Sequence, residues 1–539
     1  MTVLKFKLSL FSLFFLFSLN SFSQFSKTHY IPPVASTGSG PAAPLEQYLY
    51  ISTPNEDAFN VTITPIGGVA EIVSVSNSVP YRYTIGNGNN TNFIALTSNS
   101  SENKFTDKGF KIEAEDLVYV SARLFSGGNY QAGSIISKGL AGLGTKFRAG
   151  SFENEGNLGN GQSNYINFVS VLATQDNTIV NFSEFDNGVT FLNTDPPSDI
   201  LLNSGESYIV AISPWANSAN ATGLIGVLVE SDKPIAVNSG SLTGHNSNIN
   251  TDGGGQDIGI DQVAPVEKIG TEYIFVRGIG PNEVERPLIV AHEDNTEVYV
   301  NGTLYTTIPF AGDYVSIESI QYGVSYLIDD FSAFSNVNND GYPENTNGIP
   351  NDPAANLDDQ PATNESSNMY VNTSKPVFAY QAFGGIRPGS QGDFGITGGV
   401  ANVGLFFVPP INCQTPKIVK NIPAINQIGD EFFSGVITIV TESGSEVLIT
   451  EGGNTEDIST YGVTPTIVTS NPLFESYTIE GLTGDVSIES TTQVYVASYG
   501  AYEYATFGGY YSGFAYQPEI ILDEISVDSE GCIPNLELR

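Results

Sequence analysis

The chain has 539 residues, of which 40% are hydrophobic and 11% aromatic, while only 14% are charged. This composition excludes a disordered chain, because disordered chains are poor in apolar residues and rich in charge. The balance of 20 Lys and Arg against 58 Asp and Glu gives a net charge of −38, which argues against nucleic acid and anionic headgroups as partners, since both are bound through Lys and Arg.

The first 23 residues have the pattern of a secretory signal peptide. Lys5 and Lys7 precede an apolar run over 8–19, and a candidate cleavage segment, 21–23, comes before Gln24. The apolar run is shorter than the roughly 20 residues that span a bilayer, and no second long apolar run follows it. We therefore predict an exported protein, extracellular or on the cell surface, whose mature chain has no transmembrane segment.

Strand-type signals follow, and they recur in the same order roughly every 100 residues. Polar turns lead into alternating β-formers at 176–180 and 294–300, and a Lys-Pro turn precedes a strand at 231–237 and 373–379. Alternation places one side of each strand in a core, and proline is tolerated at the first position of a strand. We expect each Lys-Pro turn to start a strand.

These recurrences predict an all-β fold of four divergent internal repeats. The expected units span 44–140, 141–262, 263–410 and 411–520, and 521–539 is the start of a further segment or a C-terminal tail. Each unit has the short strands and regular turns of either a β-propeller-like ring or tandem β-sandwich units. The sequence leaves this choice open.

The third unit contains an acidic loop over 331–367 that is rich in Asn, Asp, Pro and Gly. Residues 336–341 partly match the start of a calcium-binding loop. The candidate metal ligands are Asn336, Asn338, Asp340 and Glu344. Asn347, at the twelfth position, lacks the bidentate carboxylate that such loops use. Calcium is the one candidate cofactor, and the loop is a candidate contact for a partner.

No motif indicates a catalytic centre, so we predict that the chain is not an enzyme. His29, His245 and His292 lie in different units without a neighbouring nucleophile motif, and we expect them at the surface or in turns. Paired carboxylates could hydrolyse glycosides, but no pattern singles out a pair among the 58 acids. Cys413 and Cys532 could pair in an exported protein, and the sequence does not decide whether they do.

The aromatic-rich stretch over 495–511 has two interpretations. Its rings could form a binding platform for a sugar or a protein, because they combine apolar area with a polar group. In a strand, however, alternate side chains face the core. We favour core packing for these rings.

Several of these segments, in this order, resemble the N-terminal domain family of IgG Fc-binding proteins. The segments that carry the resemblance are 233–240 (KPIAVNSG), 261–266 (DQVAPV), 270–273 (GTEY), 294–296 (DNT), 375–377 (KPV) and 408–410 (VPP). The resemblance covers about 45–515 and implies an extracellular binding or adhesion module without a known enzymatic centre. The opening over 24–33 is similar to members exported by gliding bacteria. Most cysteines of the animal members are missing, so antibody binding is not carried over.

We therefore predict a secreted or cell-surface binding and adhesion protein with an extracellular protein or glycan as its partner. One alternative is an enzyme that acts on extracellular polysaccharide through paired carboxylates, and another is a structural spacer of a larger surface protein. Convergent carboxylates in a cleft lined by aromatic rings would favour the enzyme. Flat acidic faces and exposed loops would favour binding.

Overall fold

A computed structural model of the chain describes residues 24–36, 44–97, 103–126, 131–154, 165–244, 257–278, 285–322, 368–384, 403–412, 415–502 and 505–514. The described residues are all-β, as the sequence predicts. Their helical elements are 3-10 turns of three or four residues: η1 (Gly139–Gly142), η2 (Ser218–Asn220), η3 (Val266–Lys268), η4 (Ser319–Tyr322) and η7 (Ile458–Tyr461). The predicted signal peptide, the loop over 331–367, its four candidate calcium ligands, His245, both cysteines and 521–539 lie outside the described residues.

The first three quarters of the chain, up to Phe407, form three large antiparallel sheets. The first sheet contains β1 (Ser26–Ile31), β3 (Pro44–Ser52), β4 (Phe59–Pro65), β5 (Glu71–Val75), β6 (Tyr81–Gly86), β9 (Phe110–Ser126) and β10 (Gln131–Ile136). The second sheet contains β8 (Lys104–Phe105), β11 (Gly144–Arg148), β12 (Ile166–Ala173), β13 (Thr178–Ser183), β14 (Ile200–Leu202), β15 (Ser207–Ile212), β16 (Leu228–Gly244) and β17 (Asp257–Val263). The third sheet contains β18 (Gly270–Val276), β19 (Leu288–Ala291), β20 (Thr296–Val300), β21 (Thr303–Ile308), β22 (Tyr314–Ser316), β23 (Asn368–Gly384) and β24 (Val403–Phe407).

The C-terminal part forms two further sheets. The fourth sheet contains β28 (Ser434–Glu442), β31 (Thr466–Ile467), β32 (Phe474–Glu480), β34 (Val494–Tyr502) and β35 (Ala505–Tyr510). The outer C-terminal sheet contains β25 (Ile418–Ile422), β29 (Val447–Glu451), β30 (Asn454–Asp457) and β33 (Val486–Ser490). Two small pairs complete the described strands: β2 (Val34–Ser36) with β7 (Ile94–Leu96), in parallel, and β26 (Gln427–Ile428) with β27 (Glu431–Phe432).

One pairing order recurs along the chain. In each of the first three sheets a strand of 17 residues pairs with one set of strands through its first part and with another set through its second part. For β16 these sets are β11 and β13, then β12 and β17. In the C-terminal part the long strand is replaced by two: β33 pairs with β25 and β29, and β34 pairs with β28 and β35.

The expectation that each Lys-Pro turn starts a strand is wrong. Pro234 and Pro376 lie in the middle of the continuous strands β16 and β23. At this point the register with β11 jumps from Glu230 to Ile235. Because a bulge leaves residues outside the hydrogen-bonded ladder, the missing N–H of proline is tolerated there.

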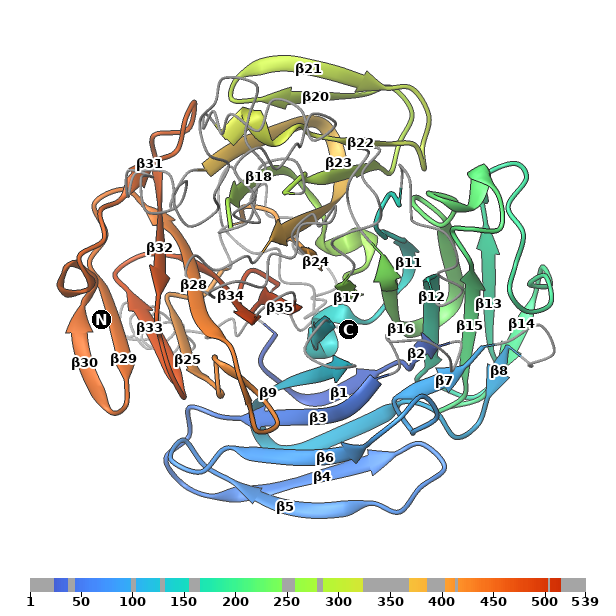
Figure 1. Cartoon of the computed structure of the whole chain (residues 1–539), viewed down its shortest axis with the longest axis horizontal. Helices are drawn as coiled ribbons and strands as arrows, with labels where there is room; N and C mark the ends of the chain where they lie inside the picture. Colours follow the sequence, from blue (N-terminus) through green and yellow to red (C-terminus); the bar gives the residue numbers. More distant parts are fainter. Residues whose placement is uncertain are drawn as a thin grey trace, which may run out of the picture.

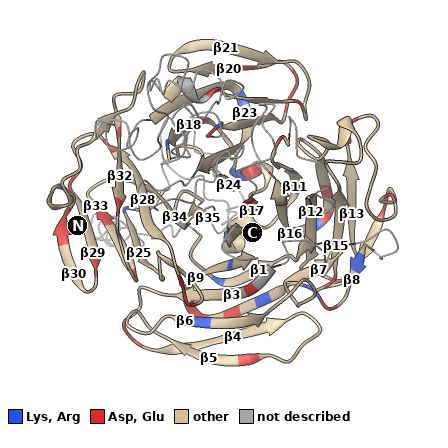
Figure 2. Cartoon of the chain, viewed as in Figure 1, with Lys and Arg blue, Asp and Glu red and all other residues tan. Residues whose placement is uncertain are grey.

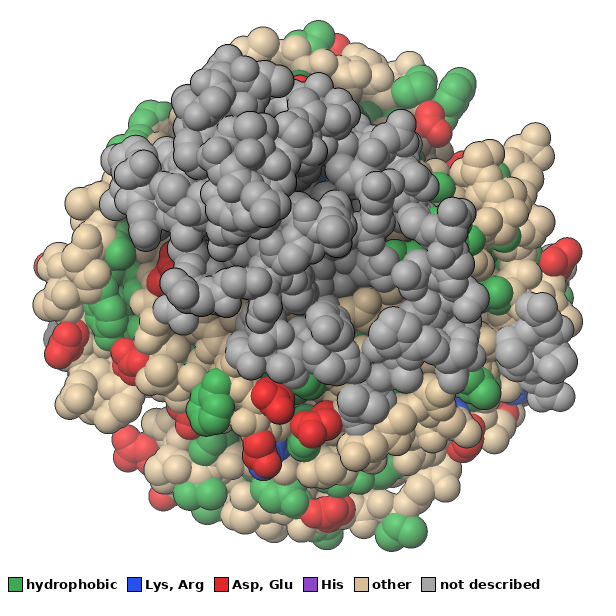
Figure 3. Space-filling model, in the orientation of Figure 1, with side chains coloured by type: hydrophobic (Ala, Val, Ile, Leu, Met, Phe, Trp, Pro, Cys, Tyr) green, Lys and Arg blue, Asp and Glu red, His purple; other side chains and the backbone are tan. Residues whose placement is uncertain are grey.

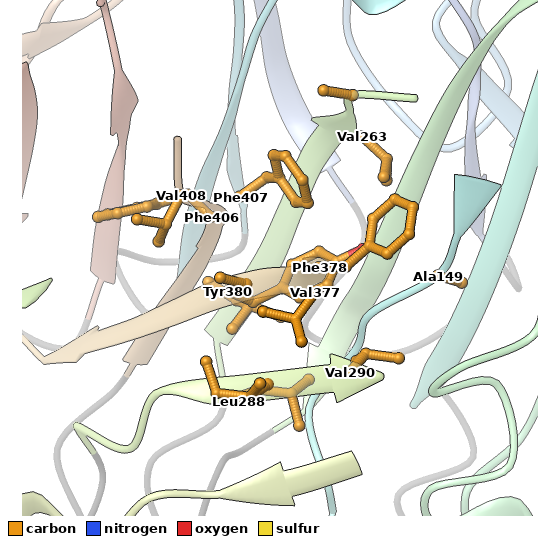
Figure 4. Packing of buried hydrophobic residues seen from close by; sticks show 14 of the residues in the cluster. Ala149, Val263, Leu288, Val290, Val377, Phe378, Tyr380, Phe406, Phe407 and Val408 are labelled. Carbon is orange, nitrogen blue, oxygen red and sulfur yellow. The ribbon is translucent and has the colours of Figure 1, made fainter. Parts of the chain in front are cut away.

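The sheets follow one another around a common centre in chain order, from blue through green and yellow to red (Figure 1). The strands β10, β17, β24 and β35 lie innermost and contact one another. Hydrophobic packing is continuous between neighbouring sheets. The rings of Phe378 and Tyr380 on β23 lie 6.1 and 5.1 Å from that of Phe407 on β24, and Val263 of β17 packs in the same cluster (Figure 4). Each such buried side chain contributes about 1.5–3 kcal/mol.

The two ends of the described chain meet and close this arrangement. The backbone N–H of Gln24 donates to the backbone oxygen of Phe514 at 2.9 Å. The buried guanidinium of Arg123, on β9, donates to the backbone oxygens of Pro423, Ala424 and Gln427 at 2.7–2.8 Å. Arg123 also lies 4.2 Å from the centre of the Tyr50 ring. Charge-assisted hydrogen bonds therefore join the first sheet to the C-terminal part.

Candidate functional site

Two buried carboxylates on β17 lie where the inner strands meet. Asp257 is fully buried, and its Oδ1 accepts the backbone N–H groups of Ala132 and Ile258 at 2.8 and 2.9 Å. Its Oδ2 accepts the backbone N–H and the hydroxyl of Thr506 at 2.7 and 2.6 Å. Burial raises the pKa of Asp257, whereas these four donors oppose the shift because they favour the charged form. Asp257 thus holds the starts of β10, β17 and β35 together.

Asp261 has the corresponding role four residues further along the same strand. Residues four apart in a strand lie on the same face, because side chains alternate between the two faces. Its Oδ1 accepts the backbone N–H groups of Ile136 and Gln262 at 3.2 and 2.8 Å. Its Oδ2 accepts the backbone N–H of Phe407 at 3.0 Å and the Nζ of Lys138 at 2.9 Å. Asp261 therefore joins the ends of β10, β17 and β24.

These contacts fix the direction of the inner strands. The starts of three of them meet at Asp257, and the ends of three meet at Asp261. A Cβ added to Gly404, at the start of β24, would lie 3.3 Å from the hydroxyl oxygen of Thr506. All four inner strands therefore run in the same direction.

A groove of about 740 Å³ lies between the first sheet and the outer C-terminal sheet. Its lining is formed by Glu56, Asn77, Ser78, Asn421, Thr450, Gly452, Gly453, Thr483, Gly484, Asp485 and Ser487. Asn421 holds the two sides together, because its Nδ2 donates to the backbone oxygens of Thr53 and Asn77 at 3.0 and 2.8 Å. Asp485 accepts the backbone N–H of Ala424 at 2.8 Å, and burial raises its pKa. The groove offers amides, hydroxyls and two carboxyl groups.

The surface charge is spread rather than concentrated. Acidic residues occur at separate places on all sides of the molecule, with fewer basic residues between them (Figure 2). On the face shown in Figure 3, acidic and hydrophobic side chains of the described residues are scattered around the rim. The described residues contain no group of three or more His, Cys, Asp or Glu that could hold a metal ion. No helix within the described ranges has the length and hydropathy of a membrane span.

The structure corrects one expectation about the histidines. His29 is not at the surface: it is fully buried, with Nδ1 2.9 Å from the Ser137 hydroxyl and Nε2 3.1 Å from two backbone oxygens, those of Ser26 and Val118. Burial lowers its pKa to about 4. The wrong expectation arose because no local pattern signals that β1 is packed inside the molecule. His292 is half-buried, and burial lowers its pKa as well.

Core packing is confirmed for the described aromatic rings of the 495–511 stretch. Tyr495, Tyr499, Phe507, Tyr510 and Tyr511 are all buried. Sequence reasoning missed Lys138, Arg123 and Asp257. A signal for the aspartates was present: in 257–263 (DIGIDQV) two Asp stand four residues apart in an apolar strand, so both face the same side.

The comparison with known families adds to this geometry. Residues 132–338 match the family model described as IgGFc binding protein. No curated protein matches the chain. The match confirms the family resemblance inferred from 233–240 and 261–266, over a narrower span than the expected 45–515. It begins in β10 and includes Lys138, Asp257 and Asp261, whereas the groove residues lie outside it. A match of this kind fits a binding module.

Proposed function

We propose that the chain is an exported binding and adhesion protein of the IgGFc-binding type, displayed outside the cell, with an extracellular protein as its partner. The observation that carries the proposal is the family match over 132–338. The predicted signal peptide over 1–23 supports export, and the similarity of 24–33 to members from gliding bacteria supports a bacterial protein of that kind.

The proposed architecture is a propeller-like ring of four divergent units over 44–140, 141–262, 263–410 and 411–520. Its support is the recurring pairing order and the common direction of the four innermost strands. In such a ring the connections between strands lie at two faces and are free to vary. We propose that the loop over 331–367 contacts the partner, with calcium at Asn336, Asn338, Asp340 and Glu344 bracing it.

The groove between the first sheet and the outer C-terminal sheet is a second proposed contact. Glu56 and Asp485 give it negative charge, and the exposed Gly452 and Gly453 leave its wall open. A chain with a net charge of −38 favours basic or neutral partners. A protein segment that carries Lys, Arg or amide groups fits this lining.

The polysaccharide-acting enzyme has weaker support. The groove contains two carboxyl groups, but its lining residues include no aromatic ring on which a sugar could stack. The buried Asp257 and Asp261 are closed off from solvent and bonded to backbone donors. A general acid and base must reach the substrate, so these two carboxylates support a structural role.

The test uses the full mature chain on a sensor surface, probed with extracellular matrix proteins, an IgG Fc fragment and a glycan array. We expect saturable binding of at least one protein probe, weakened tenfold or more by Ser78→Arg, which fills the groove. Ser74→Arg, on the exposed face of β5 outside the groove, is the matched control and should bind as the wild type does. Binding of glycans alone, cleavage of a polysaccharide, or no saturable binding to any probe would overturn the proposal.

A further inference from the structure

Lys138 and Asp261 form a buried pair between the first and second sheets. The Nζ of Lys138 lies 2.9 Å from Oδ2 of Asp261, and the two side chains are 1% and 2% exposed. They are 123 residues apart in the chain. Lys138 follows the inner strand β10, and Asp261 lies within the inner strand β17, so any covalent bond between them would lock neighbouring sheets together.

The surroundings of this pair are apolar on the side of the amine. The Nζ of Lys138 lies 5.7 and 5.1 Å from the ring centres of Phe407 and Phe514. Among the described residues Asp261 supplies its only hydrogen-bond acceptor. Burial lowers the pKa of Lys138 and raises that of Asp261. Both shifts favour the uncharged amine and the protonated carboxyl, which one proton transfer across the 2.9 Å contact produces.

We propose that Lys138 and Asp261 condense to an intramolecular isopeptide bond once the sheets have packed. The Nζ lone pair attacks Cγ of the protonated Asp261, and the Nζ–Cγ bond forms. The negative charge develops on Oδ1, which already accepts the N–H groups of Ile136 and Gln262 and is thereby stabilised. A proton then passes from Nζ to Oδ2, the Cγ–Oδ2 bond breaks, and Oδ2 leaves as water. The balance is one amine and one carboxylic acid converted to one amide and one water.

Two other sites in the molecule lack part of the combination found at Lys138 and Asp261, which is a buried amine beside a buried carboxyl group that accepts backbone N–H groups. Asp257 has the same burial and the same kind of backbone donors, but its partners are N–H groups and a hydroxyl rather than an amine. The Lys146 and Glu230 side chains stand 2.8 Å apart, yet they are 40% and 42% exposed, so this pair is not shielded from water. Positioned reactants that are shielded from water react far faster than the same groups in solution, and this condition is met at Lys138 and Asp261.

The experiment is mass spectrometry of the purified, folded full chain. We expect an intact mass lower than that of the mature sequence by one water molecule, and a branched peptide joining the segments around residues 138 and 261 after digestion. Lys138→Arg keeps the positive charge but should show the full mass and no branched peptide. Asp261→Asn, if it reacts, should lose ammonia in place of water. Lys146 and Glu230 serve as the internal control and should stay unlinked.

A wild-type chain with the full mass and with unlinked Lys138 and Asp261 peptides would overturn the proposal. The two residues would then form a buried ion pair without a covalent bond. This readout does not depend on whether a variant folds, because the wild type alone decides it. A water loss that maps to any other residue pair would overturn it as well.

Discussion

Lys233, in the middle of β16, donates from its Nζ atom to the backbone oxygen of Asp176 at 2.5 Å. Lys375 of β23 makes the equivalent bond to the backbone oxygen of Asp294, also at 2.5 Å. The two Asp are followed by Asn177 and Asn295, which share positive φ angles of 54° and 55°. The Lys-Pro and Asp-Asn elements of the sequence therefore meet in space, and the meeting repeats in the second and third sheets.

Replacement of Lys233 tests this contact. In Lys233→Met the apolar stem remains while the donor to the turn is lost, so we expect the free energy of unfolding to fall by about 1 kcal/mol. Chemical denaturation measures the change. Lys146→Met, which removes a surface ion pair with Glu230, is the control and should change stability less. If Lys146→Met lowered the free energy of unfolding as much as Lys233→Met or more, the stabilising role of the Lys233 hydrogen bond would be contradicted.

Asp257 should be far more sensitive. Asp257→Asn replaces an acceptor oxygen by an NH2 group that faces N–H donors of Ala132 and Ile258 or of Thr506. At least one buried donor then loses its partner, and we expect a loss of about 1–3 kcal/mol. Asp430→Asn, at an exposed position beside Arg82, should change stability by less than about 1 kcal/mol. Equal denaturation midpoints for both variants would argue against the conclusion that Asp257 holds the starts of β10, β17 and β35 together.

The buried His29 predicts a loss of stability in mild acid. Its folded pKa of about 4 lies below the ordinary value of 6.5, so between these values the unfolded chain binds the proton and the folded chain does not. The contribution is fully present above pH 6.5 and falls as the pH drops towards 4, by about 3 kcal/mol in total. Unfolding free energies measured from pH 7 to 4 should fall less steeply in His29→Gln than in the wild type. A His29→Gln curve that falls as steeply with pH as that of the wild type would contradict this origin.

Arg123 should govern the closure between the first sheet and the C-terminal part. Arg123→Lys keeps the charge but cannot reach three backbone oxygens with a planar fork. We expect a loss of about 3 kcal/mol and faster proteolysis near 423–427, because buried carbonyl groups are left without donors. Arg82→Lys, at a half-exposed position, is the comparison and should leave the proteolysis pattern unchanged.

Calcium removal tests the candidate ligands of the acidic loop. If the folded chain binds calcium there, thermal unfolding should shift upward between excess EDTA and millimolar calcium, since a ligand held only by the folded state stabilises it. A concentration of 100 times Kd corresponds to about 2.7 kcal/mol. Asp340→Asn should reduce the shift. An identical melting curve with and without calcium would remove Asn336, Asn338, Asp340 and Glu344 from consideration.

The sequence by itself determined the all-β class, the recurring turns and the family resemblance. These rest on local chemistry: the alternation of side chains along a strand, the positive φ accepted by Asn177 and Asn295, and the order of short motifs. The prediction from local sequence was nevertheless wrong at Pro234, which lies inside β16 and not at the start of a strand. A bulge inside one long strand has the same residue types as a turn between two strands.

Only the tertiary structure decided which charges are buried and what they hold. Asp261 meets Lys138 across 123 residues, and Arg123 meets Pro423 across 300. Contacts of this range depend on how whole sheets pack around a centre, and short-range backbone preferences carry no information about them. The same holds for His29, whose burial follows from the packing of β1 against β9. The groove between Glu56 and Asp485 likewise exists only because the first sheet and the outer C-terminal sheet meet.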